Sequence, residues 1–238
     1  EVGEVKCETD LVGGNEEFQD MVLQLASLAA AADGEGGRLL AQPYPGKTET
    51  VEEHMKETIA TIGENMTLRR AATLKVADGV VADYVHNKVG DGLGKIGVLV
   101  ALESKGDTDA LMTFGRQLAM HIAAARPEWL STAEVDQENL DRERAVLTEQ
   151  ASASGKPPEI IEKMVEGRLR KYYEEVVLLE QTFVIDNETR ISKVLEKASK
   201  DLGAPVKLTG FVRFELGEGI EKEDSDFAAE VASMTKKD

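Results

Sequence analysis

IGVLVALESKGDTDALMTFGRQLAMHIAAA, residues 96–125, is the stretch of this chain that decides its fold. The run Ile96–Glu103 is mostly apolar and has the length of a buried strand, and beyond it apolar residues recur every three or four positions from Leu111 to Ala125. A change from a short apolar run to helical spacing predicts a β-strand followed by an amphipathic helix. We therefore expect a strand–helix unit here, with the helix covering the strand.

A second copy of this pattern lies near the start of the chain. Val2–Cys7 alternates as a strand does, Asn15 has the side chain of a helix N-cap, and apolar residues recur at helical spacing from Phe18 to Ala32. A third glycine-led strand, Gly210–Phe214, follows late in the chain. The repeat predicts an α+β fold with two related subdomains, each a small antiparallel sheet packed with helices.

The residues between the two units give weaker signals. Gly34–Lys47 is rich in glycine and proline and predicts a loop, while Val51–Ile62 predicts a helix that stops at the glycine after it. Met66–Val76 and Val80–His86 are predicted to be strands. Because Asp-Gly is a favoured hairpin dipeptide, we expect these two strands to pair through a turn at Asp78-Gly79.

A highly charged region with few apolar residues follows the second unit. Ser131–Glu134 has the sequence of a capping box and is predicted to open one helix, and Ser154–Pro158 is a sharp turn into another. Each helix carries a thin seam, at Leu140, Leu147 and Ala151 on the first and at Ile161, Met164, Val165, Arg168 and Tyr172 on the second. Such helices predict an antiparallel hairpin that projects from the body and suits contact with a partner.

Composition and charge argue against several classes of protein. The formal net charge is −17, whereas binding to nucleic acid phosphates requires clustered Lys and Arg. No apolar run approaches the roughly 18 residues needed to cross a bilayer. The single cysteine, Cys7, cannot form an internal disulfide and is interpreted as a small strand residue. The sequence does not start with Met, so we expect it to begin partway through a longer gene product.

No catalytic or metal-binding constellation is apparent. His54, His86 and His121 are far apart in sequence, and His54 with Glu57 is a weak zinc signal that we interpret as a solvated helix face. His121 lies on an apolar stripe and is expected to be a satisfied, partly buried histidine. Gly90–Lys95 fails as a phosphate-binding loop, because no Ser or Thr follows the lysine. The sequence therefore predicts no catalytic residues, no metal and no cofactor, and a metal-dependent hydrolase is a disfavoured alternative.

A series of short phrases, spread over nearly the whole chain, carries a resemblance to a known family. The phrases are CETDLV (7–12), IGEN (62–65) with Arg69, Arg70, Tyr84 and His86, AMHIAA (119–124) with Pro127, GKP (155–157), MVEGR (164–168), EQTFV (180–184), GEGIEK (217–222) and DFAAEV (226–231). In this order they resemble translation elongation factor Ts of the bacterial and mitochondrial type. The first phrase departs from the family's usual TDFVA, because Leu11 stands where phenylalanine is common.

The resemblance implies a guanine-nucleotide exchange factor without an active site of its own. Its partner would be the GTPase elongation factor Tu, in the GDP-bound and nucleotide-free forms. The chain would not bind nucleic acid directly or a membrane, and a homodimer is a further expectation. It would promote GDP release by disturbing the Mg and phosphate site of the GTPase. The compartment would be the bacterial cytoplasm, with the mitochondrial matrix as the alternative. The competing interpretation is a non-catalytic scaffold that assembles through the helical hairpin.

The resemblance also implies a division of the chain and a set of contact residues. The units are a first core subdomain at 1–80, a second at 81–130 and 173–216, a coiled-coil hairpin at 131–172 and a C-terminal helical module at 217–238; the family's small N-terminal helical domain lies outside this sequence. The loop at Asp10 would push between helices of the GTPase, while the segment at Val184 would touch a distant domain or form strand core. The implied partner-binding residues are Asp10, Leu11, Val12, Ile62, Gly63, His86, Val184, Ile185, Phe227 and Val231.

Overall fold

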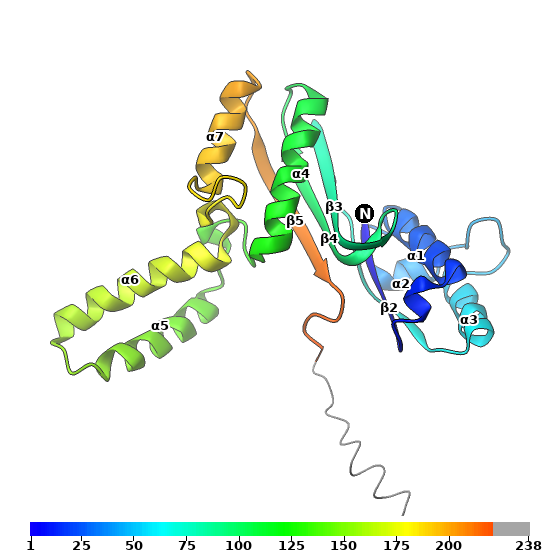
Figure 1. Cartoon of the computed structure of the whole chain (residues 1–238), viewed down its shortest axis with the longest axis horizontal. Helices are drawn as coiled ribbons and strands as arrows, with labels where there is room; N and C mark the ends of the chain where they lie inside the picture. The colour runs from blue at the N-terminus through cyan, green and yellow to red at the C-terminus, as the bar shows by residue number, and fades with distance from the viewer. Residues whose placement is uncertain (221–238) are drawn as a thin grey trace, which may run out of the picture.

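The computed structural model describes residues 1–220 and has the expected α+β class, with helices packed on two small antiparallel sheets (Figure 1). The strand order is β1-β2 in one sheet and β3-β4-β5 in the other. Each sheet has its own buried core, so we describe a first unit around β1-β2 and a second unit around β3-β4-β5. The predicted contacts at Phe227 and Val231 lie outside the described residues.

The first unit packs its helices in layers on two strands. β1 (Val2–Cys7) pairs with β2 (Met66–Ala72), α1 (Glu16–Ala29) packs against both strands, and α3 (Val51–Ile62) packs against α1. The predicted N-cap is confirmed, because the Asn15 side chain accepts a hydrogen bond from the Phe18 N–H at 3.1 Å. The buried side chains of α1 follow the predicted helical spacing and are Phe18, Met21, Leu25 and Ala29.

The second unit contains residues 96–125, the predicted strand–helix unit. β4 (Leu93–Glu103) is the central strand between β3 (Gly79–Gly90) and β5 (Lys207–Glu215). α4 (Thr108–Ala125) follows β4 and packs on the sheet, and α7 (Ile191–Asp201) contributes Ile191 and Leu195 to the same core. The central strand is buried on both faces from Val98 to Leu102, which accounts for its continuous apolar sequence.

The predicted hairpin turn at Asp78-Gly79 is wrong. β2 pairs with β1, whereas β3 pairs with β4 through a turn at Asp91-Gly92, another Asp-Gly dipeptide. Gly79 serves a different purpose, because a Cβ there would lie 2.0 Å from the Leu102 carbonyl oxygen of the neighbouring strand. Its φ of 144° is also one that other residues rarely adopt. A local dipeptide favours a turn but does not select which strands pair.

The loop predicted at 34–47 contains a short helix, α2 (Gly36–Leu40). The Glu35 carboxylate caps it by accepting hydrogen bonds from the N–H groups of Gly37 and Arg38, at 3.0 and 2.7 Å. Leu39 is then buried in the core of the first unit. Because the helix begins with two glycines, which disfavour helix formation, its sequence does not predict a helix. Burial of Leu39 stabilises it.

Two antiparallel helices, α5 (Gln137–Ser152) and α6 (Pro158–Val176), extend away from the body (Figure 1). They enclose a small core of Leu147, Ala151, Val165 and Leu169, with Leu140, Ile161 and Met164 beside it. The seam therefore matches the prediction in part: Leu169 was not predicted, and the predicted Arg168 and Tyr172 are not members of this core. The predicted start was wrong, because Ser131 precedes the short 3-10 helix η2 (Thr132–Glu134), which ends at Glu134, and Asp136 caps α5.

A polar cluster joins the two units at the end of β5. The Glu4 carboxylate is 5% exposed and accepts hydrogen bonds from Arg69, Arg70 and the Gly217 N–H. Arg70 also donates to the Glu215 carbonyl oxygen at 3.1 Å. Burial raises the pKa of the Glu4 carboxyl, but the hydrogen bonds from Gly217 and the two arginines outweigh it and hold that pKa below its usual value.

Candidate functional site

The loop that follows β1 is held beside the loop that precedes β2. Thr9 donates two hydrogen bonds to the Glu64 carboxylate, from its N–H at 3.0 Å and from its hydroxyl at 2.6 Å. The register of the sheet explains the contact, because Cys7 at the end of β1 lies opposite Met66 at the start of β2. Glu64 belongs to the phrase IGEN (62–65) but was not among the predicted site residues. Its role as the acceptor for Thr9 depends on the pairing of β1 with β2, which the sequence does not show.

The most exposed large apolar side chain in the described part of the chain lies in this loop. Leu11 is 85% exposed, while its neighbour Val12 is 4% exposed and belongs to the core of the first unit. Gln19 of α1 donates a hydrogen bond to the Gly13 carbonyl oxygen at 2.8 Å, which fixes the next residues of the loop. The backbone is therefore anchored on both sides of Leu11, and an apolar side chain is presented to solvent.

Ile62 and Gly63 end α3 next to this loop. Gly63 has a φ of 84° and donates its N–H to the Ile59 carbonyl oxygen at 2.8 Å, as in an αL helix C-cap. Ile62 is half-buried against the core of the first unit, so only part of its side chain is free for contact. We call Asp10, Leu11, Val12, Ile62 and Gly63 the Leu11 patch.

His86 lies in the second unit, on β3, and its side chain is exposed. The Tyr84 hydroxyl lies 3.0 Å from His86 Nδ1 and orients the ring. A cavity of about 990 Å³ separates the first unit from the sheet of the second, and Asp10 and Tyr84 both line it. Leu11 and His86 lie outside that lining. The fold thus brings Asp10 to the boundary between the units but does not show direct contact between His86 and the Leu11 patch.

Val184 and Ile185 form a separate patch, which we call the Ile185 patch. They lie in a turn between the 3-10 helix η3 (Leu178–Glu180) and α7, an element of the second unit that lies far from α1 and α3 of the first unit (Figure 1). Ile185 is 48% exposed and is not in a strand, so the alternative that it forms strand core is wrong. The Val184 N–H donates to His121 Nδ1 at 3.2 Å.

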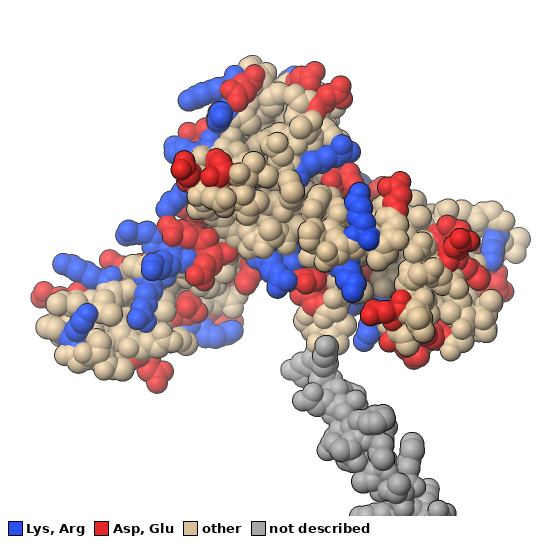
Figure 2. Space-filling model, viewed as in Figure 1, with Lys and Arg blue, Asp and Glu red and all other residues tan. Residues whose placement is uncertain are grey.

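Charged side chains of both signs cover the face of the molecule seen in Figure 2. Many of the Lys and Arg side chains on this face belong to the hairpin α5–α6, and acidic side chains are frequent over both units. The net charge of the whole sequence is −17. A surface of this kind favours association with a partner that presents basic groups.

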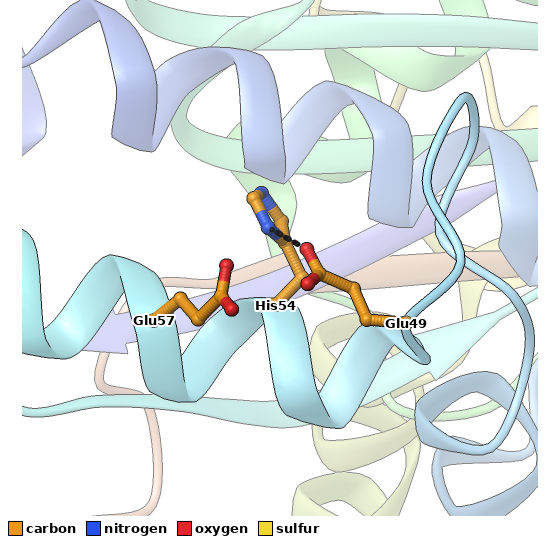
Figure 3. A group of neighbouring side chains, drawn as sticks. All are labelled: Glu49, His54 and Glu57. Atoms are coloured by element: carbon orange, nitrogen blue, oxygen red, sulfur yellow. Dashed lines mark hydrogen bonds and ion pairs between the residues drawn. The ribbon is translucent and has the colours of Figure 1, made fainter.

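One cluster outside the two patches has the donor atoms of a metal site. Glu49, His54 and Glu57 place ligand atoms within 4.8 Å of one another (Figure 3). The Lys47 Nζ lies 2.8 Å from His54 Nδ1, 3.0 Å from a Glu49 oxygen and 3.9 Å from a Glu57 oxygen. The ammonium group therefore provides a positive charge where a cation would bind, and the cluster is explained as an ion-pair network.

His54 itself corrects a prediction. It is 7% exposed, with its ring centroid 3.8 Å from that of Tyr44, so it is not on a solvated face of α3. His121, by contrast, has hydrogen-bond partners as predicted, although it is fully buried and not partly buried. Cys7 is in a strand as predicted, and burial raises the pKa of its thiol above the usual value.

Within residues 1–220, none of the helices combines the length and the apolar content that crossing a membrane requires. The predicted site residues that the structure describes form two separate patches, and His86 lies apart from both. One surrounds a highly exposed leucine on a fixed loop, and the other an exposed isoleucine in a turn.

Comparison with known proteins gives a consistent match. The family model described as Elongation factor TS matches residues 8–218. Elongation factor Ts of Rhodospirillum centenum is 62% identical over 231 residues, which cover 97% of this chain and 75% of that protein. The protein of the same name from Rhodospirillum rubrum is 63% identical over 237 residues, covering 99% of this chain and 77% of the relative. That from Bartonella henselae is 54% identical over 233 residues, covering 98% and 76%.

Proposed function

This chain belongs to the elongation factor Ts family, and from that premise we propose that it is a guanine-nucleotide exchange factor for elongation factor Tu. The observation that supports the proposal most directly is Leu11, an 85% exposed apolar side chain on a loop anchored by Val12 and Glu64. An isolated protein gains nothing by exposing such a side chain, whereas a partner that buries it gains about 1.5–3 kcal/mol.

The mechanism follows from thermodynamic linkage. In the GTPase, GDP is held by backbone N–H groups around its phosphates and by Mg²⁺. A protein that binds the nucleotide-free shape more tightly must weaken GDP by the same factor by which GDP weakens it. Insertion of Leu11 between helices of the GTPase would supply that difference in binding if it displaces the groups that hold Mg²⁺ and phosphate. This chain then needs no catalytic group of its own.

The other predicted contact residues receive supporting roles in this proposal. Asp10 and Val12 flank the inserted Leu11, while Ile62, Gly63 and His86 extend the contact along the GTPase domain. Val184 and Ile185 contact a second domain of the partner, and the segment with Phe227 and Val231 adds a further contact on the GTPase domain. Since the relatives named above are bacterial, the proposed place of action is the bacterial cytoplasm.

Release of a fluorescent GDP analogue from elongation factor Tu, followed by stopped flow, tests the proposal. Catalytic amounts of the chain should accelerate release, and Leu11→Ala should lower the acceleration by about tenfold. Ile160→Ala is the matched control, because Ile160 is also an exposed aliphatic side chain, 45% exposed, but lies on the hairpin. Release that the wild-type chain does not accelerate would refute the proposal.

Exposed apolar side chains on the hairpin support one alternative, a scaffold that assembles through α5 and α6. Val146 and Ile160 are 43% and 45% exposed. If assembly through the hairpin were the function, Val146→Ser combined with Ile160→Ser would change the mass measured by light scattering. The chain would then have no GDP-exchange activity, with or without these substitutions. An exchange factor should retain both its mass and its activity in this variant.

A further inference from the structure

A fully buried histidine supports the Ile185 patch from within the second unit. His121 on α4 is 0% exposed, and both ring nitrogens have partners. Nδ1 lies 3.2 Å from the Val184 backbone nitrogen, and Nε2 lies 2.9 Å from Gln181 Oε1. Because a backbone N–H can only donate, Nδ1 is the acceptor and Nε2 carries the hydrogen. The geometry therefore requires the neutral ring in a single tautomer.

Gln181 extends this contact to two helix ends. It is 4% exposed, and its amide nitrogen donates to the Ala125 carbonyl oxygen at 3.1 Å and to the Glu175 carbonyl oxygen at 2.6 Å. These carbonyls lie in the last turns of α4 and α6, where the helix itself leaves them without a partner. The pair His121–Gln181 thus connects α4, the root of the projecting hairpin and the turn that carries Ile185.

Backbone hydrogen bonds within the turn also hold it closed, so the contact with His121 fixes only the backbone next to Val184. The Phe183 N–H donates to the Thr189 carbonyl oxygen and the Asn187 N–H to the Phe183 carbonyl oxygen, each at 2.8 Å. Among the described residues, His121 is the acceptor that holds the Val184 N–H. Loss of that acceptor should therefore loosen the backbone at Val184 and Ile185 while the rest of the turn stays closed.

We propose that His121, oriented by Gln181, is a positioning residue that fixes the Ile185 patch for contact with the partner GTPase. The inference rests on the proposed exchange function, because it assigns a use to the patch. A fixed turn presents Ile185 without the entropic cost of ordering it on binding, so loss of the hydrogen bond should weaken association.

Two substitutions of His121 separate its two hydrogen bonds. In His121→Asn the amide oxygen can take the place of Nδ1 and still accept from Val184, whereas in His121→Gln the longer side chain can reach Gln181 but removes that acceptor. Hydrogen exchange of the Val184 amide in the free protein should be close to wild type in His121→Asn and about tenfold faster in His121→Gln. Both variants should first be checked for a cooperative thermal transition.

Binding to nucleotide-free elongation factor Tu is then measured by calorimetry. We expect affinity near wild type for His121→Asn and a severalfold loss for His121→Gln. The loss should disappear when His121→Gln is combined with Ile185→Ala, because a positioning residue acts through the side chain that it positions. A merely structural role predicts additive losses instead.

The outcomes distinguish this inference from the proposed function. Equal Val184 exchange in the Asn and Gln variants, or additive losses with Ile185→Ala, would overturn the role of His121. A wild-type chain that binds the GTPase without releasing GDP would refute the exchange function, while the Val184 exchange and the double-variant affinities would still decide the role of His121.

Discussion

The Leu11 patch and the Ile185 patch present similar side chains but anchor them in different ways. Leu11 lies in a loop tied to the Glu64 carboxylate, which is partly accessible to solvent. The turn with Ile185 is tied to His121, a neutral ring without solvent exposure. One patch belongs to the first unit and the other to the second, so the joint at Glu4 sets their relative placement. Changes to charge, burial and pH should therefore affect the two patches differently.

The largest effect is expected from breaking the joint between the units. Glu4→Ala leaves Arg69 and Arg70 without the carboxylate that both contact, and removing one partner of a buried ion pair costs about 3 kcal/mol. Urea denaturation should show this loss in the free energy of unfolding. Glu138→Ala is the control, since the pair Glu138–Arg142 is exposed and its loss should cost less than about 0.5 kcal/mol. Equal effects of the two changes would show that the Glu4 cluster contributes no more to stability than an exposed ion pair.

A smaller effect is expected from releasing the Leu11 loop. Glu64→Ala removes the acceptor of two hydrogen bonds from Thr9, each charge-assisted, so the acceleration of GDP release should fall by roughly tenfold. Thermal stability should change little because the loop is at the surface. Glu8→Ala, an exposed neighbour, serves as the control and should leave release unchanged. If Glu64→Ala behaved like the control, the anchoring role of Glu64 would be wrong.

Enlarging the exposed side chain should have a smaller effect than releasing its loop. Leu11→Phe adds apolar surface and an aromatic ring that can stack, which should strengthen coupling to the GTPase by about 1 kcal/mol and speed GDP release roughly fivefold. Stopped-flow release at limiting factor concentration measures the change. An unchanged or slower rate would remove Leu11 from the mechanism.

The smallest effect is expected from a change of pH, which should distinguish the two patches because it acts on His121 beneath the Ile185 patch. Burial lowers the pKa of His121 below its usual value, although the hydrogen bond with Gln181 opposes this. The unfolded chain therefore binds a proton at His121 near pH 6.5 while the folded chain does not, so stability should fall as pH drops below about 6.5 and level off below the lowered pKa. The Leu11 patch contains no histidine.

Thermal melts of the wild type and of His121→Asn between pH 7.5 and 5 measure this contribution. The substitution should flatten that part of the pH dependence, because it removes the titrating group. The same slope in both proteins would contradict a neutral, buried His121.

Many local elements were predictable because their signals lie within a few residues of one another. The N-cap at Asn15, the helix end at Gly63 and the buried spacing of α1 all appear where the sequence predicts them. The paired strand–helix pattern also gave the α+β class. The family phrases carried the identification, and the comparisons confirm it.

Strand pairing could not be predicted from the same signals. Asp78-Gly79 and Asp91-Gly92 have identical local chemistry, yet only the second forms a hairpin turn. Which strand pairs with β2 depends on the apolar surface that the whole first unit buries, and no short window of sequence contains that information.

By itself, the sequence determined most of the long helices and the strands, the family and the position of an apolar residue in the first loop. Only the tertiary structure decided what holds the contact residues in place. Thr9 and Glu64 are 55 residues apart, and Val184 and His121 are 63 residues apart. Hydrogen bonds over such separations form only after the strands have paired and the core has excluded water, so their geometry is a property of the folded chain.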